Sequence, residues 1–233
     1  MTDLKTQILD AALAHVVFDG WSEATLAAAI EDTGADAGEV RALFPRGPID
    51  LALAFHRRGD DAMAAALTPE ALAGMKIREK ITFAIRTRLE LMEFDKEAVR
   101  RGTTLFTLPI HAGDGAKALW ETADKIWTVI GDTSEDHNWY TKRLSLSGVY
   151  SSVVLYWLGD QSDAHEATWA FLDRRIEDVM RFEKFKAQMR DSTLLKPLMA
   201  GPEWLLGHLK APGKGGMADM PGHWGRNDGQ GEG

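Results

Sequence analysis

GADAGEVRALFPRG, residues Gly34 to Gly47, is the stretch that decides the fold. Gly34 favours a tight turn after one helix, Asp36 is a good N-cap for the next, and Pro45 ends that helix early. Such a short helix needs neighbours to hold it. Working outward toward the N-terminus, the capping residues and apolar spacing predict two more short helices, one from Asp3 to about Val17 and one from Ser22 to Gly34.

The chain after this stretch is also predicted to be helical. Pro48 opens a longer helix, and from Ile77 to Met92 apolar residues recur every three or four positions. No segment shows the alternation of a strand, so the fold class is predicted to be all-α. Further helices are expected on both sides of Pro109, from about His137 to Leu158, and from Ala164 to about Met189.

Composition excludes several classes of protein. The 233 residues are 45% hydrophobic, which is enough for a sizeable core. There is no cysteine, so disulfides, thiolate zinc sites and cysteine nucleophiles are ruled out. The longest stretch without a formal charge, Leu144 to Gly159, falls short of the ~20 apolar residues that span a bilayer. The net charge of −8 disfavours a general nucleic-acid binder, although local basic patches are still compatible with it.

The three N-terminal helices resemble the helix-turn-helix of TetR-type repressors. In those repressors the third helix enters the major groove, where Lys, Thr and Tyr commonly contact phosphates, but here those positions are occupied by Ala37, Glu39 and Arg41. Six acidic and two basic side chains lie between Ser22 and Asp50, a net charge of −4 that repels a phosphate backbone. We therefore expect a helix-turn-helix kept as a scaffold without nucleic-acid binding. A TetR-type ligand-responsive transcriptional regulator is the alternative.

A wider resemblance covers nearly all of residues 4 to 190. The chain is similar to the accessory lipid-binding proteins of ubiquinone (coenzyme Q) biosynthesis, a family with a TetR-like fold. The segments that carry this resemblance are DGWSEATL, ALFPRGPIDLALAFHRRGD, GDTSEDHNWYTKR, GVYSSVVLYWLGD and TWAFLDRRIEDVMRFEKFK.

The resemblance implies a homodimer that binds isoprenoid lipids or quinone intermediates. It also implies a protein that sits on a membrane through an amphipathic C-terminal helix and presents its ligand to the demethoxyubiquinone hydroxylase. Eukaryotic members carry a mitochondrial presequence, and folded structure is expected here from Asp3 onward. We therefore expect a bacterial member that is cytoplasmic and peripheral at the inner face of the inner membrane.

The family's partner-contact patch maps onto GDTSEDHNWYTKR, residues 131–143. The resemblance assigns the contact to Trp139 and Tyr140, with Asp132, Asn138 and Arg143 as supports. Large amphipathic rings are common at binding hot spots. The alternative is that both rings pack inward at the start of a buried helix.

A short amphipathic helix is predicted in TLLKPLMAGPEWLLGHLKAP, residues 193–212. About eight residues cannot hold a helix in water alone, so this one needs a surface to lie on. That surface is either the protein's own core or, as Trp204 and the preceding basic stretch favour, a membrane interface. The residues assigned to membrane or lipid contact are Leu195, Leu198, Met199, Trp204, Leu205, Leu206 and Leu209.

Four units follow from these patterns. Residues 1–47 form the helix-turn-helix part, and 48–190 the helical part for lipid binding and dimerisation. Residues 191–210 form the amphipathic segment, and the Gly-rich residues 211–233 are predicted to be disordered.

No catalytic constellation emerges from the sequence. No histidine has Glu three residues before it, as a di-iron helical bundle requires, and no HExxH, Gly-x-Ser-x-Gly or phosphate-loop motif is present. We therefore expect a non-enzyme with no metal and no cofactor. An apolar pocket within residues 48–190 would shield a polyprenyl tail, although the residues chosen for its lining also fit a plain core. They are Leu89, Trp120, Trp127, Val153 and Trp157.

Overall fold

The structure is a computed structural model that describes residues 3–134 and 137–191. Nine α-helices and two short 3-10 turns make up the secondary structure of these residues, and no strand occurs among them. The predicted all-α class is confirmed. The α-helices are α1 (Leu4–Asp19), α2 (Glu23–Thr33), α3 (Ala37–Leu43), α4 (Pro48–Ala66), α5 (Ile77–Glu90), α6 (Lys96–Thr107), α7 (Ala112–Val129), α8 (His137–Gly159) and α9 (Glu166–Asp191).

Of the caps predicted for the N-terminal helices, those of α2 and α3 are present, whereas Asp3 before α1 forms no side-chain cap hydrogen bond. The Ser22 side chain accepts a hydrogen bond from the backbone N–H of Thr25 at the start of α2, and Asp36 accepts one from Glu39 at the start of α3. Gly34 takes the left-handed conformation that ends α2, with φ 64°. Local chemistry therefore sets the ends of these short helices, as predicted.

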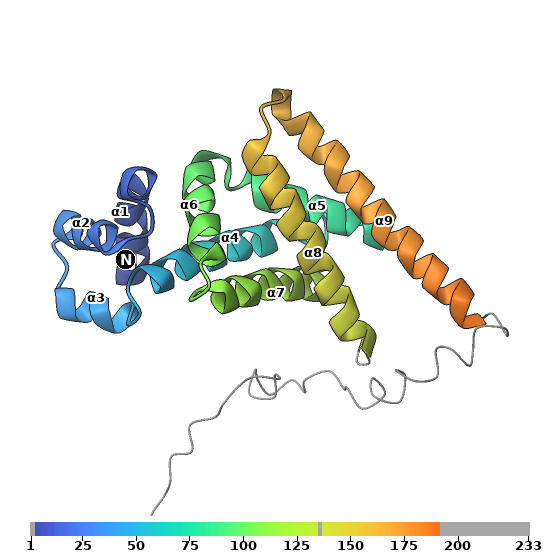
Figure 1. Cartoon of the computed structure of the whole chain (residues 1–233), viewed down its shortest axis with the longest axis horizontal. Helices are drawn as coiled ribbons and strands as arrows, with labels where there is room; N and C mark the ends of the chain where they lie inside the picture. Colours follow the sequence, from blue (N-terminus) through green and yellow to red (C-terminus); the bar gives the residue numbers. More distant parts are fainter. Residues whose placement is uncertain (1–2, 135–136, 192–233) are drawn as a thin grey trace, which may run out of the picture.

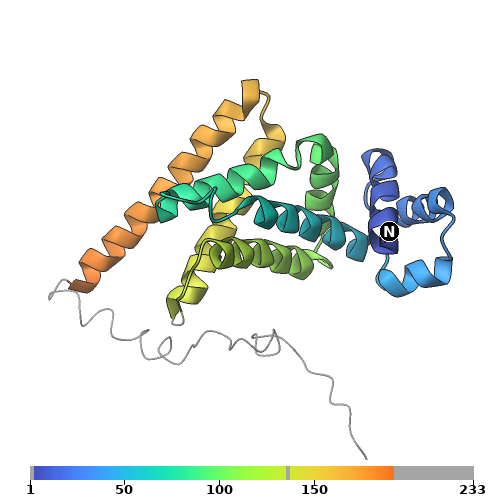
Figure 2. The same cartoon turned by 180° about the vertical axis from the view of Figure 1, so that it is seen from behind.

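The helices are arranged in two parts that share α4 (Figure 1). Helices α1, α2 and α3 lie together at one end of the molecule, and α4 runs from them into the larger helical part. Helix α8 crosses this larger part, and α9 lies along its outer edge, as the view from behind also shows (Figure 2). None of the described helices is both long and apolar enough to cross a bilayer.

One continuous hydrophobic core joins the two parts. Trp21, from the loop between α1 and α2, packs its ring against Phe55 of α4 at 5.2 Å between centroids. Its indole N–H donates to the carbonyl of Ala98 on α6 at 3.0 Å. A Cβ added at Gly102 would lie 3.5 Å from this indole nitrogen, an ordinary van der Waals distance, so the edge of the Trp21 ring contacts α6. The helix-turn-helix part is therefore packed onto the helices that follow it.

The predicted membrane-contact residues cannot be placed. The amphipathic segment after Asp191 and the predicted tail lie outside the described residues. The contact residues concerned are Leu195, Leu198, Met199, Trp204, Leu205, Leu206 and Leu209.

Candidate functional site

A cavity of about 370 Å³ lies among α4, α5, α6, α7 and α8. This volume falls in the range of roughly 300–1,000 Å³ that is typical of small-molecule sites. Most of the wall is apolar, so the cavity suits a hydrocarbon ligand. The apolar lining includes Ala52, Phe55, Leu89, Met92, Val99, Phe106, Leu119 and Val154.

The cavity has an outer and an inner side. Thr107, Ala116 and Leu155 line it and are exposed at the surface, so the cavity opens there, beside the turn between α6 and α7. Arg88 and Tyr150 also line it, but each is only 3% exposed. The opening is therefore lined by small and apolar side chains, and the inner side carries buried polar ones.

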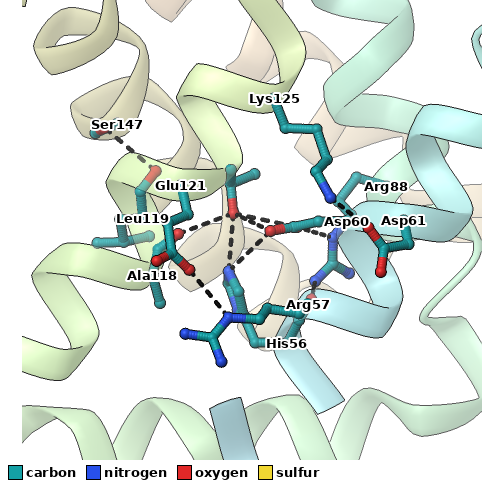
Figure 3. Close-up of polar contacts among 11 residues, drawn as sticks. His56, Arg57, Asp60, Asp61, Arg88, Ala118, Leu119, Glu121, Lys125 and Ser147 are labelled. Atoms are coloured by element: carbon teal, nitrogen blue, oxygen red, sulfur yellow. Dashed lines mark hydrogen bonds and ion pairs between the residues drawn. The ribbon is translucent and has the colours of Figure 1, made fainter. Parts of the chain in front are cut away.

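A buried polar network backs this inner side (Figure 3). Arg88 of α5 donates through Nε to Asp60 of α4 at 2.8 Å and through Nη2 to the carbonyl of His56 at 2.9 Å. Thr122 of α7 lies 3.0 Å from Asp60 Oδ2 and 2.8 Å from His56 Nε2. The simplest assignment has His56 donating to the Thr122 hydroxyl, which donates in turn to Asp60. Every charged group of the network therefore has a partner.

Gly59 makes room for this network. A Cβ at position 59 would lie 2.3 Å from Cζ of Arg88, so any larger residue would displace the guanidinium group. Only glycine lets Arg88 lie against α4 and reach Asp60, which is itself 1% exposed.

Two neutral groups complete the inner side of the cavity. Burial lowers the pKa of His56, although the charge of Asp60 acts in the opposite direction. Burial raises the pKa of Tyr150 to about 12. At neutral pH both side chains are uncharged, and the only charges in the network are the paired ones of Arg88 and Asp60.

The lowered pKa of His56 predicts a loss of stability in mild acid. The unfolded chain binds the proton more readily than the folded one, so folding weakens as the pH falls below 6.5, the ordinary value for histidine. This histidine contributes at most about 1.4 kcal/mol per pH unit. Denaturant unfolding between about pH 7.5 and 5.5 measures the effect. In His56→Gln the same pH change should cost less, and parallel losses in the two proteins would contradict the assignment.

A second, smaller cavity of about 240 Å³ lies among α5, α7, α8 and α9. Its apolar lining includes Ile81, Trp127, Val149 and Ile176, and its polar lining includes Asn138, Thr141 and Lys142. The two cavities share no lining residue. The smaller one extends to Asn138, in the segment 131–143 that was predicted to contact a partner.

The predicted partner patch forms an aromatic cluster at the start of α8. Trp139 meets Tyr140 edge-on at 4.8 Å between centroids, and both contact Trp120 of α7, at 5.7 and 6.2 Å. Trp139 and Tyr140 are partly exposed, so each ring is neither fully buried nor fully in solvent. The aromatic patch, as we call Trp120, Trp139 and Tyr140, therefore presents ring surface to solvent.

Arg143 packs against the buried side of the Trp139 ring, and Asp132 pairs with Arg143. The guanidinium of Arg143 lies 3.9 Å from the ring centroid of Trp139 and donates to the carbonyl of Trp139 at 3.1 Å. It also donates to Asp132 at 3.2 Å, and both of these side chains are nearly fully buried. Burial acts to raise the pKa of Asp132, but hydrogen bonds from Lys142, Ser134 and Arg143 lower it below its ordinary value. Asp132 therefore stays charged and holds Arg143 beneath the ring.

The residues predicted to line a lipid pocket are dispersed. Leu89 lines the larger cavity and Trp127 the smaller one. Trp120 belongs to the aromatic patch, while Val153 and Trp157 are fully buried in the core and line neither cavity. An apolar helical pattern identifies inward-facing residues, but it does not separate a filled core from a cavity wall.

Sequence reasoning missed the polar side chains of the inner wall, namely His56, Arg88 and Tyr150, together with Asp60 behind them. One signal was available, because Asp60 lies between Phe55 and Met63 on a helix whose inward face is otherwise apolar. Among the described residues, no three histidine or acidic side chains cluster as metal ligands do.

The two basic residues of the predicted helix-turn-helix face are both paired with carboxylates. Arg41 lies 3.5 Å from Glu23, and Arg46 binds Asp50 at 2.8 Å and Asp114 of α7 at 2.9 Å. The surface where a repressor would carry free cations therefore has its positive charges already neutralised.

Residues 112–183, which cover α7, α8 and most of α9, match the COQ9 family model. The chain is 28% identical to the ubiquinone biosynthesis protein COQ9 of Drosophila melanogaster, over 82% of this chain and 59% of that protein. It is 27% identical to the probable ubiquinone biosynthesis protein coq9 of Dictyostelium discoideum, over 82% of this chain and 64% of the relative. The human COQ9 protein is 28% identical over 81% of this chain and 61% of its own length. All three relatives are named as mitochondrial, and the chain spans about three fifths of their lengths.

A solved structure of a TetR transcriptional regulator from Nitrosomonas europaea has the same fold. The TM-score is 0.62 at 18% identity, and the match covers 76% of this chain and 97% of the regulator. The TetR-like fold and the family resemblance predicted from the sequence are thereby confirmed.

Proposed function

Because this chain is a relative of the COQ9 proteins over 82% of its length, we propose that it is a lipid-binding accessory protein of ubiquinone biosynthesis. It binds isoprenoid quinone intermediates at a membrane and presents them to the demethoxyubiquinone hydroxylase. It performs no chemistry of its own in this role. The observation that carries the proposal is the largely apolar cavity of about 370 Å³ in the helical part of the molecule.

Transfer energetics support such a carrier. Exposing a polyprenyl tail to water costs about 0.8 kcal/mol per methylene group. Moving the tail from a bilayer into an apolar cavity exchanges one hydrocarbon environment for another and avoids this cost. Shielding the tail is therefore most of what the protein has to do.

The cavity opening is suited to a membrane surface. It lies beside the turn between α6 and α7, where Leu108 is 46% and Ile110 81% exposed. Exposed apolar side chains at this place would contact lipid and let a tail pass between bilayer and cavity. The amphipathic segment 191–210, which lies outside the described residues, is proposed on its sequence as a second membrane contact.

The aromatic patch is the proposed contact with the hydroxylase. Its rings are large and partly exposed, and Arg143 holds the Trp139 ring in place, which suits a binding hot spot. Asn138 is exposed next to Trp139 and is assigned to the same contact. Exposed apolar side chains on α8 and α9, such as Leu144 and Phe182, support a homodimer.

A ligand-responsive transcriptional regulator is the second candidate, and the TetR-like fold is the observation that favours it. The paired states of Arg41 and Arg46 count against it, because phosphate binding needs free cations. Tight duplex binding that weakens steeply with salt would favour this candidate over ours.

Native mass spectrometry of the purified full-length protein, with lipid identification, tests the proposed function. We expect an isoprenoid lipid to copurify with the protein, and a complex to form when the hydroxylase is added. Deletion of residues 194–210 should weaken binding to liposomes while leaving the lipid in the cavity. A protein that is empty of lipid and ignores the hydroxylase would overturn the proposal.

A further inference from the structure

The inner side of the larger cavity differs from the rest of its wall. His56, Arg88 and Tyr150, which we call the polar wall, line it from α4, α5 and α8. A hydrocarbon ligand cannot form hydrogen bonds with polar groups in the cavity wall, and a buried polar group without a partner costs free energy. The polar wall therefore needs an explanation that shielding a tail does not give.

Other hydroxyl groups around the cavity have partners in their own helices. Thr103 donates to the carbonyl of Val99 at 3.0 Å, and Ser151 donates to that of Gly148 at 3.1 Å. The Tyr150 hydroxyl is different, because it has no hydrogen-bond partner among residues 3–134 and 137–191. A 3% exposed side chain that lines the cavity thus carries a donor that a ligand can use.

Arg88 offers further donors at the same place. Its hydrogen bonds within the described chain use Nε, toward Asp60, and one N–H of Nη2, toward the His56 carbonyl. A guanidinium group carries more N–H groups than these, and Arg88 faces the cavity. Tyr150 and Arg88 together therefore form a pair of hydrogen-bond donors on the inner wall.

The charge of the polar wall restricts what these donors can bind. Asp60 already neutralises Arg88 at 2.8 Å, and both side chains are almost fully buried. A phosphate or carboxylate group would enter with no counter-charge and would lose its hydration. A neutral oxygen acceptor meets no such penalty, because it needs only donors.

We propose that the polar wall binds the ring end of the ligand, with Tyr150 and Arg88 donating hydrogen bonds to neutral ring oxygens. The ligand class is then a neutral oxygen-bearing ring, such as a quinone or phenol with a prenyl tail, and not a prenyl diphosphate or a fatty acid. This inference rests on the proposed function and adds an orientation to it. The ring lies inside, away from water, and the tail points to the opening beside the turn between α6 and α7.

Ligand titrations of the purified full-length protein test the orientation. The probes are a short-tailed ubiquinone, an isoprenoid hydrocarbon of the same tail length and the corresponding prenyl diphosphate. We expect the quinone to bind about tenfold more tightly than the hydrocarbon, and the diphosphate to bind more weakly than the quinone. Tyr150→Phe should remove most of the preference for the quinone and leave hydrocarbon binding unchanged.

Tyr156→Phe is the matched control, because Tyr156 is on the same helix, is stacked on Phe171 and does not line the cavity. It should bind all three probes as the unchanged protein does. Hydrocarbon binding without a preference for the quinone, or a preference that survives in Tyr150→Phe, would overturn this inference alone. Tightest binding of the diphosphate would overturn it as well. Failure to bind any of the probes would overturn the proposed function along with it.

Discussion

Asp60→Ala is expected to lower the free energy of unfolding by about 3–5 kcal/mol, because it leaves Arg88 as an unpaired buried charge. The exposed fractions of the two side chains are 3% for Arg88 and 2% for Asp60, so water cannot replace the lost partner without opening the core. The same substitution also removes one acceptor of the Thr122 hydroxyl, which keeps the carbonyl of Ala118 at 3.1 Å. Since domains of this kind are stable by only about 5–15 kcal/mol, the effect is a large part of the total. Urea unfolding monitored by circular dichroism measures it.

Asp61→Ala provides the matched control for this prediction. Asp61 is the next residue of α4 and also pairs with a cation, Lys125, but its side chain is 71% exposed. Exposed ion pairs contribute about 0–1 kcal/mol, so this variant should unfold almost as the unchanged protein does. Equal losses in the two variants would show that the Asp60–Arg88 pair is not shielded from water as the structure describes.

The sequence predicted the helices well because their ends depend on local chemistry. Ser22, Asp36 and Pro48 act through hydrogen bonds and backbone angles within a few residues of themselves, and each lies where it was expected. The TetR-like arrangement was predicted from the resemblance of these helices and turns to those of TetR-type repressors. Long-range packing was not needed to predict either feature.

The inner wall of the cavity could not be predicted in this way. Asp60 and Arg88 are separated by 28 residues along the chain, and no local sequence pattern around either residue indicates that the two pair. Their pairing depends on how α4 and α5 pack, and on the missing side chain of Gly59 between them. For the same reason Trp157 and Leu89 look alike in the sequence, although one fills the core and the other lines a cavity.

The partner patch was placed by family resemblance, and the structure supplies the physical connection among its members. Arg143, within α8, pairs through Nε with Asp124 of α7 at 2.5 Å and through Nη1 with Asp132 at 3.2 Å. These two ion pairs fix its guanidinium against the Trp139 ring. The aromatic patch is therefore preorganised, which lowers the entropy lost when a partner binds.

From this arrangement we expect Trp139→Ala to weaken binding of the hydroxylase by about 30-fold, or about 2 kcal/mol, which is typical of a tryptophan hot spot. Trp169→Ala is the matched control, since Trp169 is also a partly exposed tryptophan beneath which an arginine, Arg86, lies 4.9 Å from the ring centroid. It lies near the start of α9, which is next to the end of α8 and so a full helix length away from the start of α8 (Figure 1). Titration of labelled hydroxylase with each purified variant gives the affinities, and circular dichroism checks that both remain folded. If the two variants bind equally well, the aromatic patch is not the contact surface and Trp139 serves only to cover Arg143.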